Sequence, residues 1–224
     1  VGVTGADLVA EAGRGVEELL DLGFGRCRLA VAVRDDCAAA RPEDLPAGTR
    51  VATSFPRVAR AYFASLGVTA DVTPISGAAE IAPTLGVADA IVDLVSTGST
   101  LRVNGLREIG TILESSARLV ARPGLAAAEG AGAEVRALVA ALESVLRAER
   151  KRYLMANVPR DRLDEVREVL PGISGPTIVE VMDGGSWVAA HAVVDGDDVY
   201  HTIRRLKDLG AEGILVTRIE RLLP

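Results

Sequence analysis

The sequence has few cysteines, histidines and aromatic residues. Its 224 residues include two cysteines and two histidines, and aromatic residues make up 3% of the chain. So few Cys and His residues argue against a disulfide-built scaffold and against a zinc site. The lack of aromatic residues argues against a single-strand nucleic-acid binder, which needs them for base stacking. No apolar run approaches the roughly 20 residues that a membrane helix requires.

Charge and length narrow the class further. The formal net charge of −6 disfavours a general nucleic-acid binder, although a local basic pocket can still hold phosphates. The start of the chain lacks the basic and apolar regions of a signal peptide. We therefore expect a cytoplasmic protein that binds neither a membrane nor nucleic acid, and that is long enough for more than one packed core.

Strand and helix patterns alternate up to about residue 149. The runs "CRLAVAVR" and "ADAIVDLVS" predict strands, and "PRVARAYFASLG" predicts a helix with Pro56 in its first turn. The segment "VEELLDLGFG" suggests an amphipathic turn, and "AAEIAPTLG" a short helix. This alternation predicts an α/β region with a mostly parallel sheet.

The pattern changes after a long amphipathic helix that ends near Arg150. Strand, helix, two strands joined at Gly184-Gly185, helix and strand follow within the last 75 residues. The order βαββαβ predicts a ferredoxin-like module. The clearest domain boundary of the chain is therefore expected near residue 150.

The stretch "IVDLVSTGST", residues 91–100, combines an apolar strand with a loop of small hydroxyl residues. A phosphate needs several converging N–H donors and little steric bulk, which Gly, Ser and Thr provide. The Asp93 carboxylate just before the loop is suited to accept hydrogen bonds from a pair of ribose hydroxyls. The stretch thus predicts a ribose 5-phosphate site. The alternative is a plain strand-to-helix turn, in which the hydroxyls only satisfy the loop backbone.

The surrounding residues resemble a known family. "EIAPTLGVADAIVDLVSTGSTL", from Glu80 to Leu101, resembles the signature of ATP phosphoribosyltransferase, the first enzyme of histidine biosynthesis. The resemblance extends to "GVTGADLV", "RVATSFPRVAR", "ESSARLVA" and the C-terminal segments "GPTIVEV" and "LGAEGILVTRI". The C-terminal module is similar to that of the long form of the family, which carries its own regulatory domain.

The resemblance implies a two-lobed catalytic region of the periplasmic-binding-protein-like type II fold, followed by the ferredoxin-like βαββαβ regulatory domain. With chain crossings near Arg34 and Asn104, lobe one would hold residues 1–34 and 105–149. Lobe two would hold 35–104, and the histidine-sensing domain 150–224. The family also has an N-terminal segment before the "GVTG" loop that this sequence does not contain, so lobe one is expected to be incomplete.

The implied reaction is attack by adenine N1 of ATP on C1 of phosphoribosyl pyrophosphate, which releases pyrophosphate with the help of Mg²⁺. The chain would then be a pentosyltransferase. Asp93 would hold the ribose hydroxyls. Glu80 would serve the metal-pyrophosphate end, although helix capping or lobe packing is an equal alternative. The 5-phosphate would be held by the loop residues Ser96, Thr97, Gly98, Ser99 and Thr100.

Two further sets of residues match family segments. On the nucleotide side these are Thr4, Gly5 and Asp7, where Asp7 would accept from the adenine amino group or instead cap a helix. Inhibition by histidine is implied for the C-terminal module, at Ile173, Gly175, Thr177 and Gly213. The alternatives there are a strand-entry turn, a small packing residue, and a module used only for assembly.

The remaining histidines, His191 and His201, are expected to be structural or solvent-facing, and the cysteines inert. A homo-oligomer, from dimer to hexamer, is expected. Two rival functions remain. One is a two-lobed solute-binding or effector-binding module without catalysis. The other is a phosphoribosyltransferase acting on a free base, but those enzymes commonly place two acids before the loop, whereas here Val92 precedes Asp93.

Overall fold

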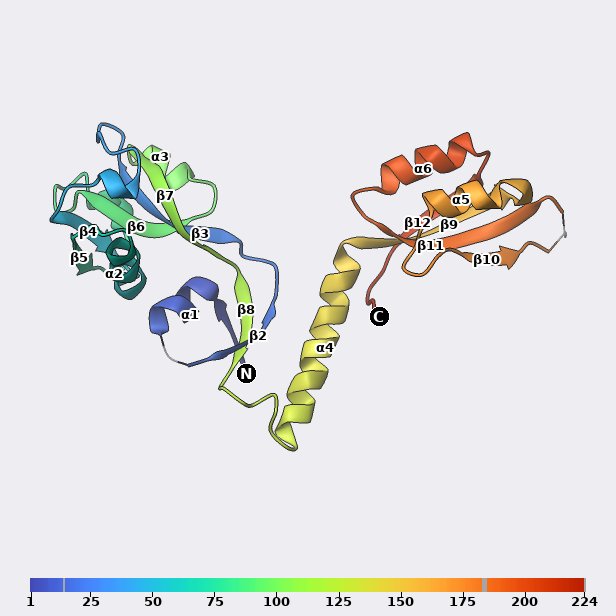
Figure 1. Ribbon diagram of the computed structural model, residues 1–224, viewed down its shortest axis with the longest axis horizontal. Helices are drawn as coiled ribbons and strands as arrows, with labels where there is room; N and C mark the ends of the chain where they lie inside the picture. Colours follow the sequence, from blue (N-terminus) through green and yellow to red (C-terminus); the bar gives the residue numbers. More distant parts are fainter. Residues whose placement is uncertain (14, 183–184, 224) are drawn as a thin grey trace. The chain divides into compact units, whose positions relative to one another are not determined.

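The computed structural model describes residues 1–13, 15–182 and 185–223. The chain divides into two compact units, Val1–Arg136 and Ala137–Pro224. In Figure 1 the first unit runs from blue to green, and the ferredoxin-like part of the second is orange to red. Among the described residues, no helix has both the length and the apolar character needed to cross a membrane.

The largest sheet of the first unit has five strands in the order β5-β4-β6-β3-β7. Strand β4 pairs in parallel with β5 and β6, whereas β3 runs antiparallel to both β6 and β7. The expectation of a mostly parallel sheet is therefore wrong, and the sheet is mixed. The bounds are β3 Cys27–Arg34, β4 Thr49–Thr53, β5 Ala70–Pro74, β6 Ala90–Val95 and β7 Leu106–Ser115.

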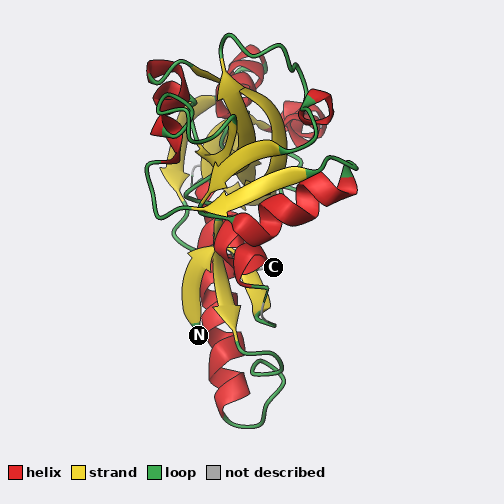
Figure 2. Cartoon of the chain, turned by 90° about the vertical axis from the view of Figure 1, so that its left-hand side faces the viewer, coloured by secondary structure: helices red, strands yellow, loops and turns green. Residues whose placement is uncertain are grey.

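Strand β3 explains how this sheet is covered on both faces. Its large residues Leu29, Val31 and Val33 belong to one apolar cluster with Phe63 of α2 (Pro56–Ser65). Its alanines, Ala30 and Ala32, belong to a second cluster on the opposite face, because side chains alternate along a strand. That second cluster includes residues of α3 (Ser99–Val103) and of the 3-10 turn η2 (Ala79–Ile81). Figure 2 shows the strands in yellow and the helices in red.

The predicted chain crossings near Arg34 and Asn104 are wrong. Strand β3 is buried on both faces, and its two edges pair with β6 and β7. Residues 27–34 and 106–115 therefore belong to the sheet that holds the loop after β6. The connections to the other sheet lie near residues 22–26 and at Ser116, instead of near Arg34 and Asn104.

The second sheet of the first unit has three antiparallel strands in the order β1-β8-β2. These are β1 Gly2–Gly5, β8 Ala117–Ala121 and β2 Glu17–Asp21. The turn expected for "VEELLDLGFG" is thus wrong, because Glu17–Asp21 pairs with β8 as a strand. The break between β7 and β8 falls at Ser116. The short helix expected over "AAEIAPTLG" is only the 3-10 turn η2.

The second unit contains most of α4 (Ala131–Glu149) and a four-stranded antiparallel sheet in the order β10-β11-β9-β12. Helices α5 (Leu163–Val169) and α6 (Val199–Asp208) cover one face of it (Figure 1). The strands are β9 Lys151–Pro159, β10 Thr177–Glu180, β11 Trp187–Asp195 and β12 Glu212–Arg218. The predicted ferredoxin-like arrangement is confirmed, although Gly184 of its predicted hairpin lies outside the described residues.

The boundary of this unit differs from the predicted residue 150. Most of α4 belongs with the sheet that follows it. One reason is the C-terminal tail, where the Leu222 backbone N–H donates to the Ser144 carbonyl at 2.8 Å. The α/β fold class, with its separate ferredoxin-like module, is nevertheless as the sequence predicted.

Candidate functional site

The candidate site lies at the end of strand β6, which runs through the core of the first unit. Ile91 and Val92 are fully buried between β4 and β3, and the Thr53 hydroxyl donates to the Val92 carbonyl at 2.6 Å. The strand ends at Val95, and α3 begins at Ser99 after Gly98, which adopts a left-handed φ of 73°. A residue with a Cβ is disfavoured in that conformation, so glycine permits this turn.

One pocket collects the residues that the signature predicted. It has a volume of about 170 Å³ and is lined by Glu80, Asp93, Leu94, Val95, Ser96, Thr97, Gly98, Ser99, Thr100 and Leu101. Glu80 reaches it from η2, and the other residues come from β6, the loop and α3. Segments that are separate in the sequence thus contribute to one small polar cavity.

Asp93 is partly buried in this pocket, and its Oδ1 accepts from the Leu94 backbone N–H at 2.8 Å. Burial raises the pKa of the Asp93 carboxyl above its ordinary value. The Leu94 hydrogen bond opposes that rise, and repulsion from Glu80 adds to it. Two carboxylates in one cavity create a region of negative potential that favours a cation or developing positive charge.

The hydroxyls of the loop partly bond to one another. Thr97 Oγ1 lies 2.9 Å from Ser99 Oγ and accepts from the Ser99 N–H at 3.4 Å. Within the described part of the chain, the amide N–H groups of Thr97 and Gly98 have no hydrogen-bond partner. The loop therefore presents free N–H donors and hydroxyls together, as an anion site requires.

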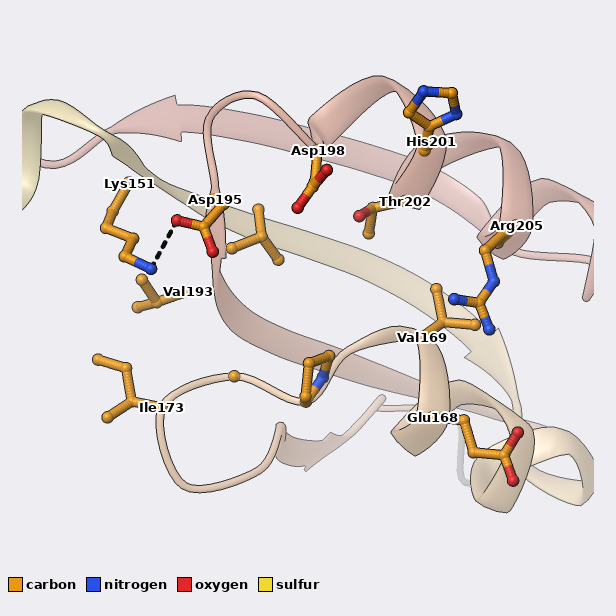
Figure 3. A pocket seen from close by; sticks show the side chains of 13 residues that line it. Lys151, Glu168, Val169, Ile173, Val193, Asp195, Asp198, His201, Thr202 and Arg205 are labelled. Carbon is orange, nitrogen blue, oxygen red and sulfur yellow. Dashed lines mark hydrogen bonds and ion pairs between the residues drawn. The ribbon is translucent and has the colours of Figure 1, made fainter.

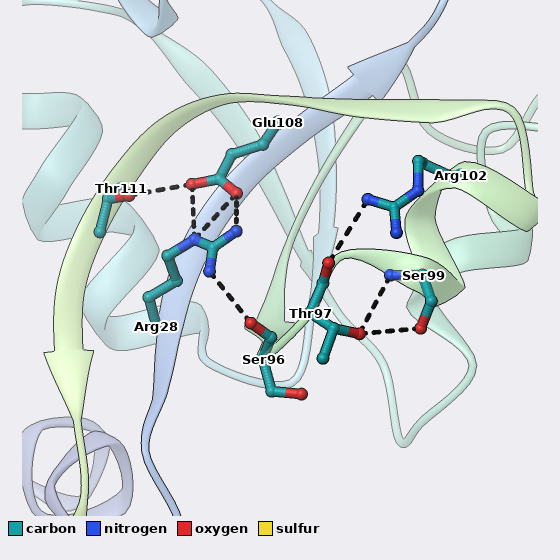
Figure 4. A network of polar contacts seen from close by, with 7 residues as sticks. All are labelled: Arg28, Ser96, Thr97, Ser99, Arg102, Glu108 and Thr111. Carbon is teal, nitrogen blue, oxygen red and sulfur yellow. Dashed lines mark hydrogen bonds and ion pairs between the residues drawn. The ribbon is translucent and has the colours of Figure 1, made fainter.

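A network that the sequence analysis missed supports the loop from behind (Figure 4). Arg28 of β3 donates to both carboxylate oxygens of Glu108 on β7, with its shortest contact at 2.6 Å. It also donates to the Ser96 carbonyl at 3.3 Å. Glu108 accepts from the Thr111 hydroxyl at 2.9 Å. No local pattern signals a pair that is 80 residues apart, because the two residues meet only when β3 pairs with β7.

The predicted nucleotide-side residues do not line this pocket; they belong to the other sheet and to α1 (Ala6–Ala12). Asp7 is only 5% exposed and accepts from the Ser115 hydroxyl, while its own N–H donates to Ser115 Oγ at 3.1 Å. Its side chain does not cap α1, whose N-cap is Gly5. A Cβ at Gly5 would lie 2.2 Å from the Asp7 carboxylate, so this close approach requires glycine.

The predicted effector residues are divided between the two edges of the four-stranded sheet. Thr177 begins β10 and Gly213 lies on β12, with β11 and β9 between them. Three strand spacings separate the two edges, or about 14 Å. Gly213 sits at a register shift with a φ of 56°, so it forms a bulge as well as a small packing position. A Cβ there would lie 3.4 Å from Asn157 Nδ2, which makes Asn157 a neighbour that the sequence did not reveal.

Ile173 lies away from these strands, in the loop after α5, and is 62% exposed. It lines a separate cavity of about 380 Å³ between this loop and α6 (Figure 3). Lys151 and Asp195 form an ion pair of 2.7 Å at one end, and Arg205 lies farther along α6. Neither Gly175 nor Thr177 nor Gly213 lines this cavity.

The histidines and cysteines agree with a structural interpretation. His191 Nδ1 lies 2.8 Å from the Tyr153 hydroxyl on the paired strand, and His201 is exposed. Burial raises the pKa of the Cys27 thiol, which disfavours a reactive thiolate. The described residues contain no cluster of three or more His, Cys, Asp or Glu side chains suited to a metal ion.

Comparison with known proteins gives one consistent result. The profile described as ATP phosphoribosyltransferase matches residues 1–144, and that of the HisG C-terminal domain matches residues 148–221. The ATP phosphoribosyltransferase of Gemmatimonas aurantiaca is 56% identical across all of this chain and 78% of its own length. That of Methanopyrus kandleri is 50% identical, with 100% and 77% covered.

A solved structure also shares the fold. An ATP phosphoribosyl transferase (HisG:HisZ) complex from Thermotoga maritima is 25% identical, with a TM-score of 0.58 over 65% of this chain and 69% of that one. The signature from Glu80 to Leu101, the pocket lined by its residues and the family matches over both units all indicate the same family. The chain belongs to the ATP phosphoribosyltransferase family of pentosyltransferases.

Proposed function

We propose that this chain transfers the phosphoribosyl group of phosphoribosyl pyrophosphate to N1 of the adenine of ATP, as the first step of histidine biosynthesis. The observation that supports this most strongly is the single pocket shared by Glu80, Asp93 and the loop Ser96–Thr100. Its lining combines carboxylates for a sugar with N–H and hydroxyl donors for a phosphate. This is the combination that a ribose 5-phosphate requires.

The 5-phosphate would lie on the loop. The amide N–H groups of Thr97 and Gly98, which donate to no described residue, would donate to its oxygens, together with the hydroxyls of Ser96 and Thr100. Asp93 would accept from the 2- and 3-hydroxyls of the ribose. These contacts would hold C1 in one orientation, so that the attacking nitrogen meets it in line with the leaving oxygen.

The chemistry breaks the C1–O bond, whose electron pair leaves with pyrophosphate, and forms a bond from adenine N1 to C1. Positive charge develops on the ribose as the bond breaks. The carboxylates of Asp93 and Glu80 would stabilise that charge, because both face the same small cavity. Only the ionised form of Asp93 can do so. Its raised pKa therefore predicts activity that falls as the pH is lowered towards that pKa.

Mg²⁺ is proposed as the metal of the reaction. The residues fit it, since Mg²⁺ usually binds through one or two carboxylates together with substrate phosphates, and Glu80 and Asp93 supply two. When bound, it would neutralise the charge of the departing pyrophosphate. Glu80 is the residue proposed to orient it.

The nucleotide side is proposed to lie at Thr4, Gly5 and Asp7. One carboxylate oxygen of Asp7 is occupied by the Ser115 hydroxyl, and no described residue donates to the other. In the proposed complex, that second oxygen would accept from the amino group of an adenine. Two hydrogen bonds with Ser115 hold Asp7 in place before ATP binds, and the missing side chain of Gly5 leaves room for the carboxylate.

Inhibition by histidine is proposed for the C-terminal module, at Ile173, Gly175, Thr177 and Gly213. The two sheet edges are about 14 Å apart, farther than one amino acid can reach. If both edges contribute, the site must be completed by a second copy of the module, which agrees with a homo-oligomer. Histidine affinity should then fall when the protein is diluted below its dissociation concentration, as titrations at two protein concentrations would test.

The assay for the main proposal is pyrophosphate release from phosphoribosyl pyrophosphate by the complete gene product. ATP should support release, whereas free adenine, orotate and no acceptor should not. A binding module without catalysis would release no pyrophosphate with any acceptor. A base-specific phosphoribosyltransferase would respond to adenine or orotate in preference to ATP.

A further inference from the structure

Two consecutive carbonyls of the phosphate loop are held by arginines (Figure 4). The Ser96 carbonyl accepts from Arg28 Nη1 at 3.3 Å, and the Thr97 carbonyl accepts from Arg102 Nη1 at 3.4 Å. In a trans peptide, the carbonyl and the following N–H point in opposite directions, and none of the described residues has a cis peptide bond. Fixing these carbonyls therefore fixes the directions of the N–H groups of Thr97 and Gly98.

Arg28 is itself held firmly. Its guanidinium contacts both Glu108 oxygens, at 2.6 to 3.0 Å, and Thr111 bonds to the same carboxylate. The two side chains are only 30% and 24% exposed. Glu108, Arg28 and Ser96 belong to β7, β3 and the end of β6, which are neighbours in the sheet. A contact chain across three adjacent strands thus ends on a loop carbonyl.

Arg28 does not line the pocket of Asp93. Arg28, Arg102 and Glu108 line a separate cavity of about 550 Å³. This cavity and the pocket of Asp93 have only Thr97, Gly98 and Leu101 in common. The effect of Arg28 on a ligand must therefore pass through the loop backbone.

We propose that Arg28, held by Glu108, is a positioning residue of the phosphate loop. It fixes the Ser96 carbonyl, so that the Thr97 N–H is aimed at the phosphate before the substrate binds. The inference rests on the proposed function, in which this loop holds the 5-phosphate. It adds a residue outside the signature to the machinery that recognises the phosphoribosyl donor.

The chain contains a matched control at the other end of β6, where a second arginine bonds to a carboxylate and a loop carbonyl. Arg50 of β4 donates to Asp89 at 3.1 and 2.6 Å and to the Gly86 carbonyl at 2.8 Å. The chemistry is the same: an arginine, a carboxylate and a loop carbonyl. Asp89 precedes β6, however, whereas Ser96 follows it. Removing Arg50 should cost similar contacts without disturbing the phosphate loop.

The experiment is calorimetric titration of ribose 5-phosphate into the complete gene product and its variants Arg28→Met and Arg50→Met. The unmodified protein should bind. Arg28→Met should bind about tenfold more weakly, the size expected when one donor to a charged group is misdirected. Arg50→Met should stay within about twofold, since it lies outside the loop's supporting shell. In steady-state kinetics, Arg28→Met should raise the KM for phosphoribosyl pyrophosphate and leave the KM for ATP unchanged.

Arg28→Lys and Glu108→Gln serve if Arg28→Met does not fold. Lysine keeps a donor for the Ser96 carbonyl but not the bidentate pair, so Arg28→Lys should recover part of the affinity. The positioning role would be overturned if Arg28→Met and Arg50→Met bound ribose 5-phosphate equally well. It would also be overturned if Arg28→Lys and Glu108→Gln bound it as tightly as the unmodified protein. Either result would leave the proposed function intact. Failure of the unmodified protein to bind ribose 5-phosphate would instead overturn both.

Discussion

The two units carry their candidate sites in different ways. In the first, Glu80, Asp93 and the loop Ser96–Thr100 line one pocket, because Asp93 lies on β6, the loop follows this strand and η2 contacts it. In the second, Thr177 and Gly213 occupy opposite edges of a four-stranded sheet, and Ile173 lines a different cavity. Residues gathered around one strand line a single pocket within one chain. If residues of both sheet edges bind one ligand, a second copy of the module must bring the two edges together.

The largest expected effects test whether the two units are separate in stability. Phe63 and Leu154 are among the largest fully buried side chains of their clusters. Phe63→Ala should lower the free energy of unfolding by about 3–5 kcal/mol, and Leu154→Ala by about 2–5 kcal/mol, because each leaves a cavity. In differential scanning calorimetry each variant should shift a different transition, and ribose 5-phosphate should stabilise only the one moved by Phe63→Ala. Equal shifts of a single transition would mean that the units unfold together.

Asp93→Asn separates function from stability within the first unit. Losing a charged hydrogen bond to the ribose should lower kcat/KM about ten- to a hundredfold, or roughly 1.5–3 kcal/mol. The melting temperature at neutral pH should not fall, because the raised pKa of Asp93 means that its ionised form is penalised in the folded protein. The exposed Asp71→Asn is the control. Unchanged kinetics in folded Asp93→Asn would remove this residue from the site.

Gly98→Ala tests the loop conformation. Gly98 and Gly67 have nearly equal left-handed φ values, 73° and 70°, so alanine at either should cost about 1–2 kcal/mol of stability. A Cβ at Gly67 meets nothing within 4 Å, whereas one at Gly98 lies 3.2 Å from the Arg102 guanidinium. Urea unfolding should give similar losses for both variants. Only Gly98→Ala should weaken ribose 5-phosphate binding, and equal affinities would contradict a phosphate role for the loop.

The smallest expected effect concerns pH. The hydrogen bonds from Arg28 hold the pKa of Glu108 below its ordinary value. This pair therefore stabilises the fold above the ordinary glutamate pKa, and the contribution is lost as the pH falls through the lowered one. Glu108→Gln should flatten the acid limb of the stability curve of the first unit. The exposed pair Arg160–Glu180 in the second unit has the same direction of shift, but Glu180→Gln should change the curve less and only at low salt.

Much of the fold and part of the site could be predicted from the sequence. The run from Glu80 to Thr100 could be interpreted locally, because a buried strand followed by small hydroxyl residues is a contiguous pattern. The ferredoxin-like module followed in the same way from its strand and helix order. What failed was the assignment of strands to sheets. Leu29, Val31 and Val33 look alike whichever sheet they join, and only the pairing of β3 with β6 and β7 places them.

The sequence by itself determined the family, the order of the elements and the contiguous phosphate loop, since all three are encoded in neighbouring residues. The tertiary structure decided which distant residues meet. Arg28 reaches Glu108 and the Ser96 carbonyl because β3 lies between β7 and β6. Thr177 and Gly213 are kept apart because β9 and β11 lie between their strands. Hydrogen bonding between strands fixes these distances. The residues of a single strand do not specify which other strand it will pair with.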